Sequence, residues 1–171
     1  MRKKRGALNL ELPERKILFN NSGWPTQIKK VYGLTSNKII EELMILANVS
    51  AAEEIIRYNY PAIYRVHEPP SPEKYKSLID IIGKPLADSL IGKVPHPLLM
   101  NKILENTKET ADYDMINQSI LRSQSQAKYH NENKSHFGLA LKNYVHFTSP
   151  IRRYSDLIIH RQIIEIISNK N

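Results

Sequence analysis

A short segment near the C-terminal end of the chain gathers residues suited to binding an anion. It runs Ser149-Pro-Ile-Arg152-Arg153, and Asp156 and His160 follow it. Serine is a favoured N-cap residue and proline is favoured at the first helical position, so the sequence predicts a helix capped by Ser149. Arg152 and Arg153 then lie in its first turn, where cations are unfavourable unless an anion binds. Free backbone amides and two guanidinium groups suit a phosphate, and we predict that Ser149, Arg152 and Arg153 bind one.

Asp156 is spaced to organise this segment. It lies one turn after Arg152 and one turn before His160, so we expect it to hold both side chains. The residues alone leave a second interpretation open, because buried charges must be paired in any case. On that interpretation the cluster is an ion-pair network that only fixes the helix.

Two other pairs of acidic residues have types and positions that could serve chemistry. Glu41 and Glu42 interrupt an almost wholly apolar segment, and they either reach the surface, pair with an arginine, or face a ligand. Asp112 and Asp114 could bind a metal as a pair, but helix capping explains them better. The histidines show no zinc-binding spacing, and the residues alone predict no metal site.

Composition limits the class of protein. The chain has 171 residues, enough for one domain, and its 25 basic against 17 acidic residues give a net charge of +8. This excess favours polyanions such as RNA. There are no cysteines, so no disulfide or thiolate site is expected. The basic opening segment lacks an apolar stretch, and no apolar run is long enough to span a membrane, so we expect a cytoplasmic protein.

The hydrophobic pattern predicts strands first and helices afterwards. Alternation over Leu8–Leu12, followed by short apolar runs and a turn, predicts a small antiparallel sheet at the N-terminal end. The fold class expected is therefore α+β, a small sheet followed by mostly buried helices, in one unit over residues 1–171. The remaining expected elements are strands at 17–19, 24–31 and 63–66, helices at 35–58, 72–83, 98–105 and 113–129, and irregular chain at 85–97.

Four blocks of the sequence resemble one enzyme family. HFGLALKNYVHFTSPIRRYSDLIIHR, residues 136–161, closely resembles the closing signature of the ribonuclease R and ribonuclease II exoribonucleases, in their RNB-type catalytic domain. Three further blocks resemble the same domain in the same order: RGALNLELPE at 5–14, IIEELMILANVSAAE at 39–53 and PAIYRVHEPPSPEK at 61–74. The last of these is closer to ribonuclease R.

The resemblance implies hydrolysis of single-stranded RNA from its 3′ end with Mg²⁺ held by clustered aspartates. That cluster belongs upstream of the first block, and the first aspartate here is Asp80, so the magnesium ligands are missing from this chain. The family's OB-type RNA-binding domains are missing too, and residues 1–171 correspond to a single partial RNB-type domain. The resemblance makes Arg152 the catalytic arginine and implies that Glu41 or Glu42 faces the RNA. Ser149 and Arg153, predicted above to bind phosphate, are then expected to contact the RNA as well.

The function expected is the RNA-channel and phosphate-stabilising half of a 3′→5′ exoribonuclease, inactive alone. A separately encoded N-terminal half would then be its partner. The alternatives are a non-catalytic RNA-binding subunit and a decayed gene product, so whether the chain is an enzyme stays open at this point.

Overall fold

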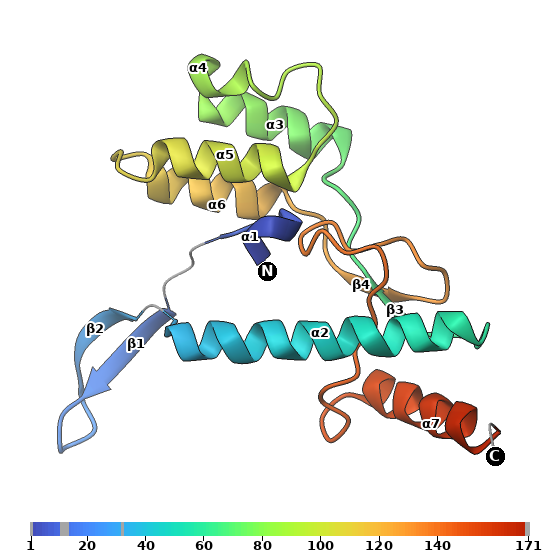
Figure 1. Ribbon diagram of the computed structural model, residues 1–171. Coiled ribbons are helices and arrows are strands. Elements are labelled where there is room, and N and C mark those ends of the chain that lie inside the picture. The colour runs from blue at the N-terminus through green and yellow to red at the C-terminus, as the bar shows by residue number, and fades with distance from the viewer. Residues whose placement is uncertain (1, 11–13, 32, 170–171) are drawn as a thin grey trace.

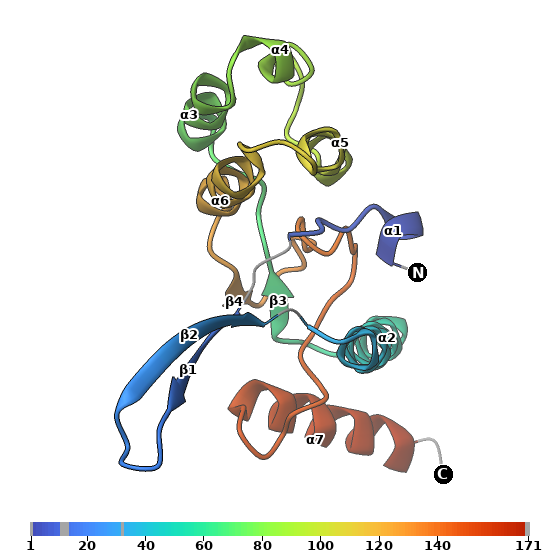
Figure 2. The same ribbon diagram turned by 90° about the vertical axis from the view of Figure 1, so that its left-hand side faces the viewer.

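The computed structural model describes residues 2–10, 14–31 and 33–169. In chain order the elements are α1 (Arg2–Arg5), β1 (Glu14–Phe19), β2 (Pro25–Val31), α2 (Thr35–Arg57), β3 (Tyr64–Val66), α3 (Pro72–Ile82), α4 (Lys84–Ala87), α5 (Pro97–Thr107), α6 (Tyr113–Ser123), β4 (Lys128–His130) and α7 (Tyr154–Ser168). Helices α3 to α6 form one group, and the long helix α2 lies apart from them with α7 beside it (Figures 1 and 2). The expected α+β class is confirmed.

Strands β1 and β2 form an antiparallel hairpin that projects from the rest of the molecule (Figure 1). Its turn is stabilised by the Asn20 side chain, whose Oδ1 accepts hydrogen bonds from the backbone N–H groups of Ser22 and Trp24. Gly23 supplies the positive φ of 80° that such a tight turn requires. The predicted strands at 17–19 and 24–31 are confirmed.

The strand expected over Leu8–Leu12 is not formed in its described part. The N–H of Leu8 donates to the Gly138 carbonyl, 2.8 Å, and the N–H of Asn9 donates to the Asn101 side chain, 2.9 Å. These backbone groups therefore bind a loop and a helix instead of a neighbouring strand. Residues 11–13 of that prediction lie outside the described part of the chain.

Helix α2 matches the predicted helix, but its two halves differ in burial. Ala51, Ala52 and Ile55 in the second half are buried against β3 and α7. In the first half Ile39 and Leu43 are each 57% exposed. The even apolar composition of this helix predicted burial along its whole length, and the structure shows it for the second half.

Helices α3 to α6 enclose the larger apolar core, which includes Leu78, Leu90 and Met100. Ser71 caps α3 as predicted, since its Oγ accepts the N–H of Lys74 at 3.4 Å. Within the segment 85–97 expected to be irregular, the structure forms the short helix α4.

The helix predicted for 113–129 ends early, because α6 stops at Ser123. The residues that follow form β4, which pairs antiparallel with β3. Asp112 holds the predicted N-cap position, but its side chain makes no capping hydrogen bond. No helix in the described residues is long and apolar enough to cross a membrane.

Candidate functional site

Residues 149–153, here called the arginine loop, form a turn before α7. The Ser149 carbonyl accepts hydrogen bonds from the backbone N–H groups of Arg152, 3.3 Å, and Arg153, 3.1 Å. Arg153 then has an extended backbone, φ −133° and ψ 117°, so the helix starts only at Tyr154. The prediction that Ser149 caps α7 is therefore wrong, as is the placing of both arginines in its first turn. The backbone amides of Arg152 and Arg153 are therefore not free to bind an anion, because they already donate to the Ser149 carbonyl.

Asp156 binds both ends of the arginine loop. Its side chain is fully buried, and its Oδ1 accepts the backbone N–H of Ser149 and the guanidinium of Arg153, each at 2.8 Å. Burial alone raises the pKa of this carboxyl, but the hydrogen bonds from Ser149 and Arg153 and the charge of Arg153 bring the pKa below its ordinary value. An ionised aspartate therefore fixes both ends of the loop.

Arg152 is the exposed member of the arginine pair. Its guanidinium lies 3.4 Å from the Ser149 hydroxyl, and the neighbouring Ile151 is fully exposed. The expectation that Asp156 holds Arg152 is wrong, because the extended backbone at Arg153 breaks the helical register between them. The structure instead fixes Arg153 and leaves Arg152 facing solvent, where it can reach a ligand.

His160 is held by the chain segment before the loop and not by Asp156 as expected. Its Nε2 lies 2.9 Å from the Phe147 carbonyl oxygen, and its ring stacks on the Phe147 ring with centroids 4.1 Å apart. This contact packs α7 against the segment that leads into the arginine loop.

Asn48 connects the same segment to α2. It is 3% exposed, and its Oδ1 accepts the backbone N–H groups of Phe147, 2.8 Å, and Thr148, 3.2 Å. Its amide nitrogen donates to the Tyr144 hydroxyl at 3.1 Å. The sequence analysis did not identify this role of Asn48. The available signal was an amide in an otherwise apolar stretch of helix, where a buried polar group must find partners.

Glu41 and Glu42 have different environments. Glu42 is paired with Arg5 at 3.4 Å, both side chains are 21% exposed, and Arg5 also donates to the Leu139 carbonyl at 2.8 Å. Glu41 is paired with Arg2 at 3.0 Å but remains 48% exposed. Glu42 is thus tied into the fold, and Glu41 is the more accessible carboxylate.

A cavity of about 420 Å³ brings part of the predicted site together. Its lining includes Glu41 and Asn48 from α2, Thr148, and Arg153 from the arginine loop. Arg152, Ser149 and Glu42 do not line it. The structure therefore places Glu41 and Arg153 around one cavity. The exposed Arg152 immediately precedes Arg153 in the chain.

A row of rings runs from β3 and β4 toward this cavity. Arg65 lies over the Tyr129 ring, 4.8 Å from its centroid, and the Tyr129 hydroxyl is 2.8 Å from His146 Nδ1. The row continues edge-to-face through Tyr144 to His136. Tyr129 is 42% exposed, so its ring offers a surface on which a base can stack.

The histidines of this row are held neutral. Burial, followed by the charge of Arg153, lowers the pKa of His146 to about 4. Burial, followed by the nearby His67, lowers the pKa of His136 to about 3. At neutral pH the cationic character of the site therefore comes from arginine.

The carboxylates of the site do not fit a magnesium ion. Glu41 and Glu42 are paired with arginines, and Asp156 is enclosed by hydrogen bonds from Ser149 and Arg153. Across residues 2–10, 14–31 and 33–169 no group of three acidic or histidine side chains is placed to hold a metal. Mg²⁺ prefers several oxygen ligands in octahedral geometry, which these paired side chains do not offer.

The sequence of this chain matches a known protein family. The RNB domain model matches residues 1–169. The chain belongs to the RNB family. Ribonuclease R of Vibrio cholerae is 41% identical over 169 residues, covering 99% of this chain and 21% of the relative. Ribonuclease R of Escherichia coli is 38% identical with the same coverage.

Solved structures of the RNB family agree with the fold. Mycoplasma genitalium RNase R in complex with ribose-methylated single-stranded RNA matches with a TM-score of 0.80 and 32% identity. The match covers 95% of this chain and 26% of that one. The chain thus spans about a fifth of the length of its ribonuclease R relatives, and the resemblance to ribonuclease R predicted from the sequence is confirmed.

Proposed function

We propose that this chain is the RNA-channel and phosphate-binding part of a 3′→5′ exoribonuclease that hydrolyses RNA phosphodiester bonds. Its relatives are ribonuclease R enzymes, and solved RNase R structures contain single-stranded or double-stranded RNA. The observation that carries the proposal is the exposed Arg152 guanidinium, on a loop fixed by the buried Asp156.

In this proposal Arg152 contacts the scissile phosphate. Arg153 and the backbone of Ser149 position it through Asp156, and the Ser149 hydroxyl limits the positions of its guanidinium. A guanidinium held in advance stabilises charge that develops in the transition state, because it needs little reorganisation at the moment of reaction. Glu41 is the better candidate for contact with RNA sugar, since Glu42 is committed to Arg5.

Catalysis in this proposal needs residues beyond residues 1–171. RNB-family exoribonucleases generally depend on a divalent metal, Mg²⁺ in this family, and the site described above does not fit one. We therefore propose that residues 1–171 form a partial catalytic domain that is inactive alone. A separately encoded N-terminal half, carrying the aspartate cluster, completes it. A non-catalytic RNA-binding subunit is the second candidate, favoured by the pairing of the site's carboxylates with arginines.

The test measures Mg²⁺-dependent release of nucleotides from a 3′-tailed RNA. The chain is assayed alone and with the part of the RNB domain of Vibrio cholerae ribonuclease R that precedes its matched segment. We expect no release by the chain alone and restored release by the mixture. In the mixture, Arg152→Ala should lower kcat about 10²–10³-fold, which is far more than it weakens RNA binding, because binding loses only one phosphate contact.

Arg161→Ala is the matched control, because Arg161 is an exposed arginine within α7. This substitution should leave kcat unchanged. Arg152→Lys should restore little activity, since lysine lacks the planar fork that matches phosphate. Processive degradation by the chain alone, or near-normal kcat for Arg152→Ala, would contradict the proposal. RNA binding without release in any mixture would favour the non-catalytic subunit.

A further inference from the structure

Strand β3 carries an arginine whose guanidinium is free to bind an anion. Arg65 is partly exposed and lies over the Tyr129 ring, with its guanidinium carbon 4.8 Å from the ring centroid. Its side chain makes no hydrogen bond or ion pair with residues 2–10, 14–31 and 33–169. Glu68, three residues further along the chain, is paired with Lys128 at 2.8 Å. The planar fork of Arg65 is therefore available for a phosphate.

The Tyr129 ring is held in place beside this guanidinium. Tyr129 is the cross-strand partner of Arg65 in the β3–β4 pair, so the two side chains lie on one face of the sheet. Its hydroxyl lies 2.8 Å from His146 Nδ1, and the two rings meet edge-to-face with centroids 5.6 Å apart. The side chain nevertheless remains 42% exposed. An aromatic ring fixed in this way can stack on a nucleobase with little further loss of side-chain freedom.

This face of the sheet continues into the arginine loop. His146, which binds Tyr129, precedes the first residue of that loop by only three positions. Burial is the main cause of the lowered pKa of His146, and the charges of Arg65 and Arg152 both add to it. Both guanidinium groups therefore act at the position of one ring. A strand held at Arg152 can continue over Arg65 and Tyr129.

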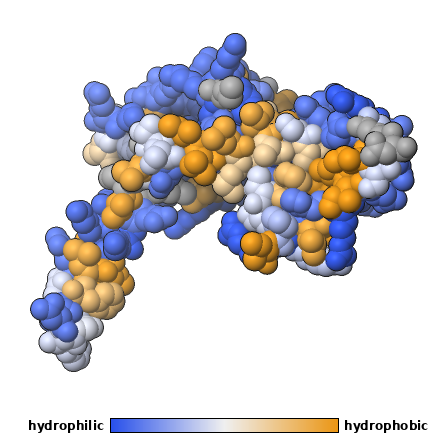
Figure 3. All heavy atoms as spheres, turned by 60° about the horizontal axis from the view of Figure 1, so that its bottom comes forward, coloured by the Kyte–Doolittle hydropathy of each residue, from blue (hydrophilic) through white to orange (hydrophobic). Residues whose placement is uncertain are grey.

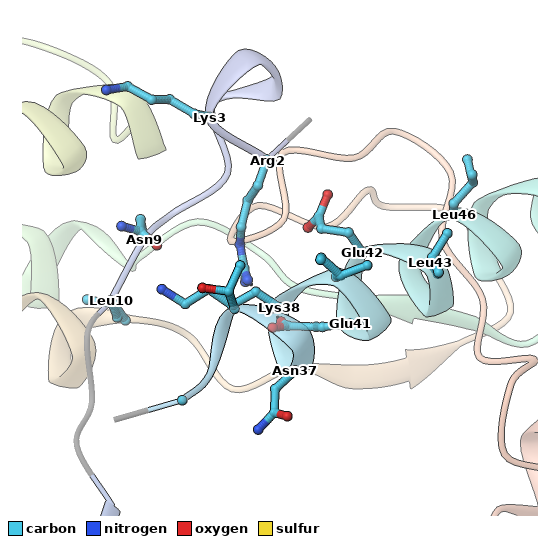
Figure 4. Close-up of a pocket in the computed structure, with 13 residues that line it drawn as sticks. Arg2, Lys3, Asn9, Leu10, Asn37, Lys38, Glu41, Glu42, Leu43 and Leu46 are labelled. Atoms are coloured by element: carbon cyan, nitrogen blue, oxygen red, sulfur yellow. Dashed lines mark hydrogen bonds and ion pairs between the residues drawn. The ribbon is translucent and has the colours of Figure 1, made fainter. Parts of the chain in front are cut away.

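The larger cavity beside the first half of α2 combines cations with carboxylates. It has a volume of about 950 Å³, and its lining includes Arg2, Lys3, Glu41 and Glu42 (Figure 4). Arg2 is paired with Glu41 at 3.0 Å. Because carboxylates lie among these cations, we expect a phosphate to bind more weakly there than at Arg65.

The β1–β2 hairpin also exposes an aromatic ring, but its turn brings no charge to that ring. Apolar side chains gather on this hairpin (Figure 3), and Trp24 at its turn is 71% exposed. Residues 19–28 contain no charged side chain. A base stacked on Trp24 would therefore find no cation in the turn for its phosphate, whereas Tyr129 has Arg65 beside it.

We propose that Arg65 and Tyr129 form a nucleotide subsite for single-stranded RNA beside the arginine loop. The Tyr129 ring stacks on one nucleobase, and the Arg65 guanidinium binds the phosphate of that nucleotide. His146 holds the ring in position through the Tyr129 hydroxyl. This inference rests on the proposed function and extends it, because it adds a base contact to the phosphate contact at Arg152.

The combination of groups favours RNA over an acidic polypeptide. Carboxylates of a polypeptide would satisfy the Arg65 guanidinium but would leave the exposed Tyr129 ring without a stacking partner. A nucleotide supplies both a flat base and an anion. Since every base has a π-face, the subsite should accept RNA without sequence preference.

The experiment measures the affinity of the chain for two fluorescent ligands by anisotropy at low salt. One ligand is a twelve-nucleotide oligouridine, and the other is an abasic oligoribonucleotide with the same phosphates. Tyr129→Leu should weaken oligouridine binding at least about fivefold, the lower end of the effect of losing one stacked base. The same variant should bind the abasic ligand as the unaltered chain does. Tyr129→Phe keeps the ring and should bind both ligands normally.

The phosphate contact is tested by Arg65→Gln, which should weaken the binding of both ligands. This variant should lower the magnitude of the salt slope for oligouridine by about 0.7, and the double variant Arg65→Gln/Arg152→Ala should lower it by about 1.4, because the two arginines contact different phosphates. Photocrosslinking of the unaltered chain to an oligomer that carries 5-iodouridine should modify Tyr129. This measurement needs no substitution, so it keeps the test valid if a variant unfolds.

Two matched controls replace exposed residues outside the subsite. Trp24→Leu removes the exposed ring of the hairpin, and Arg161→Gln removes an exposed arginine within α7. Both variants should bind the two ligands as the unaltered chain does, with the same salt slope.

The proposal is overturned if Tyr129→Leu binds oligouridine normally, or if it weakens the binding of both ligands equally. An effect of Trp24→Leu without an effect of Tyr129→Leu would place the base contact on the hairpin and overturn it as well. Binding of polyglutamate but not of oligouridine, lost in Arg65→Gln, would overturn it in favour of an acidic polypeptide. If the mixture with the Vibrio cholerae ribonuclease R part releases no nucleotides while the Tyr129 and Arg65 effects on binding persist, only the proposed function is contradicted.

Discussion

Arg152 and Arg153 are neighbours in the sequence, but the buried carboxylate of Asp156 separates their roles. Asp156 binds Arg153 at 2.8 Å and the backbone of Ser149 at the same distance, while Arg152 remains exposed. An exposed arginine contributes little to folding, whereas removing one partner of a buried pair leaves an uncompensated charge. The two positions should therefore respond differently to the same substitution.

We predict that Arg153→Ala lowers the free energy of unfolding by about 3 kcal/mol at pH 7, because Asp156 then stays buried without its guanidinium partner. Urea unfolding followed by circular dichroism measures this change. Arg152→Ala is the matched control and should lie within about 0.5 kcal/mol of the unaltered chain. Equal effects of the two substitutions would mean that the arginine loop is not fixed in the way described.

Gly138 is the position where the loop after β4 approaches His67 most closely. A Cβ added there would lie 2.9 Å from His67 Nδ1, and the Gly138 N–H donates to that nitrogen at 3.0 Å. The His67 ring cannot move freely, because it is buried and its Nε2 lies 2.7 Å from the Ser125 carbonyl.

We therefore predict that Gly138→Ala lowers the free energy of unfolding by about 1–3 kcal/mol, the usual effect of overpacking. Gly33→Ala is its control, since an added Cβ there meets nothing within 4 Å. Thermal unfolding of both variants checks the prediction, and similar losses at the two sites would refute it.

At the scale of elements, local signals in the sequence predicted most helices, and tertiary contacts decided the rest. Ser71 and Pro72 set the start of α3 as predicted, because capping depends on nearby residues only. Ser149 and Pro150 carry the same local signal but do not start α7. There the Ser149 N–H is taken by Asp156, seven residues later, and Arg153 becomes extended. A capping pattern does not reveal such a competing partner.

The candidate site likewise combines residues that local signals predicted with residues whose roles depend on tertiary contacts. The arginine pair and Glu41 could be selected from residue types and from family resemblance, and the structure places Glu41 and Arg153 around one cavity. The role of Asn48 could not, because its partners Phe147 and Thr148 lie about a hundred residues away. Long-range contacts of this kind follow from packing and not from sequence spacing.

The ring row that joins β3, β4 and the segment before the arginine loop should make stability depend on pH. The pKa of His136 is lowered to about 3 and that of His146 to about 4, whereas an unfolded histidine titrates near 6.5. Below pH 6.5 the unfolded chain therefore binds protons that the folded chain does not bind, and stability falls as pH decreases.

We predict that the free energy of unfolding falls between pH 7 and pH 5, with up to about 1.4 kcal/mol per pH unit from each of these histidines. Urea titrations at several pH values measure the slope, and His136→Gln should reduce it. His130→Gln is the control, because it replaces a histidine outside the ring row. The lowered pKa of Asp156 does not enter this range, since its stabilising effect is lost only as pH falls below the ordinary aspartate value. A slope unchanged by His136→Gln would contradict the prediction.

At the scale of the whole molecule, the charge distribution separates two surfaces. The hairpin and the first half of α2 expose apolar side chains, among them Ile17, Phe19 and Leu43. The arginine loop and the ring row combine guanidinium groups with aromatic rings at the 420 Å³ cavity. That second combination is typical of surfaces that bind single-stranded nucleic acid.

We predict that the chain binds a twelve-nucleotide oligouridine in a salt-dependent manner, because each phosphate that meets a cation releases condensed counterions. The logarithm of the association constant should fall linearly with the logarithm of salt concentration, by about 0.7 for each phosphate contacted. Arg152→Ala should reduce the magnitude of this slope by about 0.7, since it removes one exposed cation from the arginine loop.

Lys93→Ala is the matched control, because Lys93 is an exposed lysine in the α3–α6 group, and it should leave the slope unchanged. Fluorescence anisotropy over a range of salt concentrations measures both slopes. Affinity that does not change with salt, or equal slopes for the two variants, would show that RNA does not contact the arginine loop.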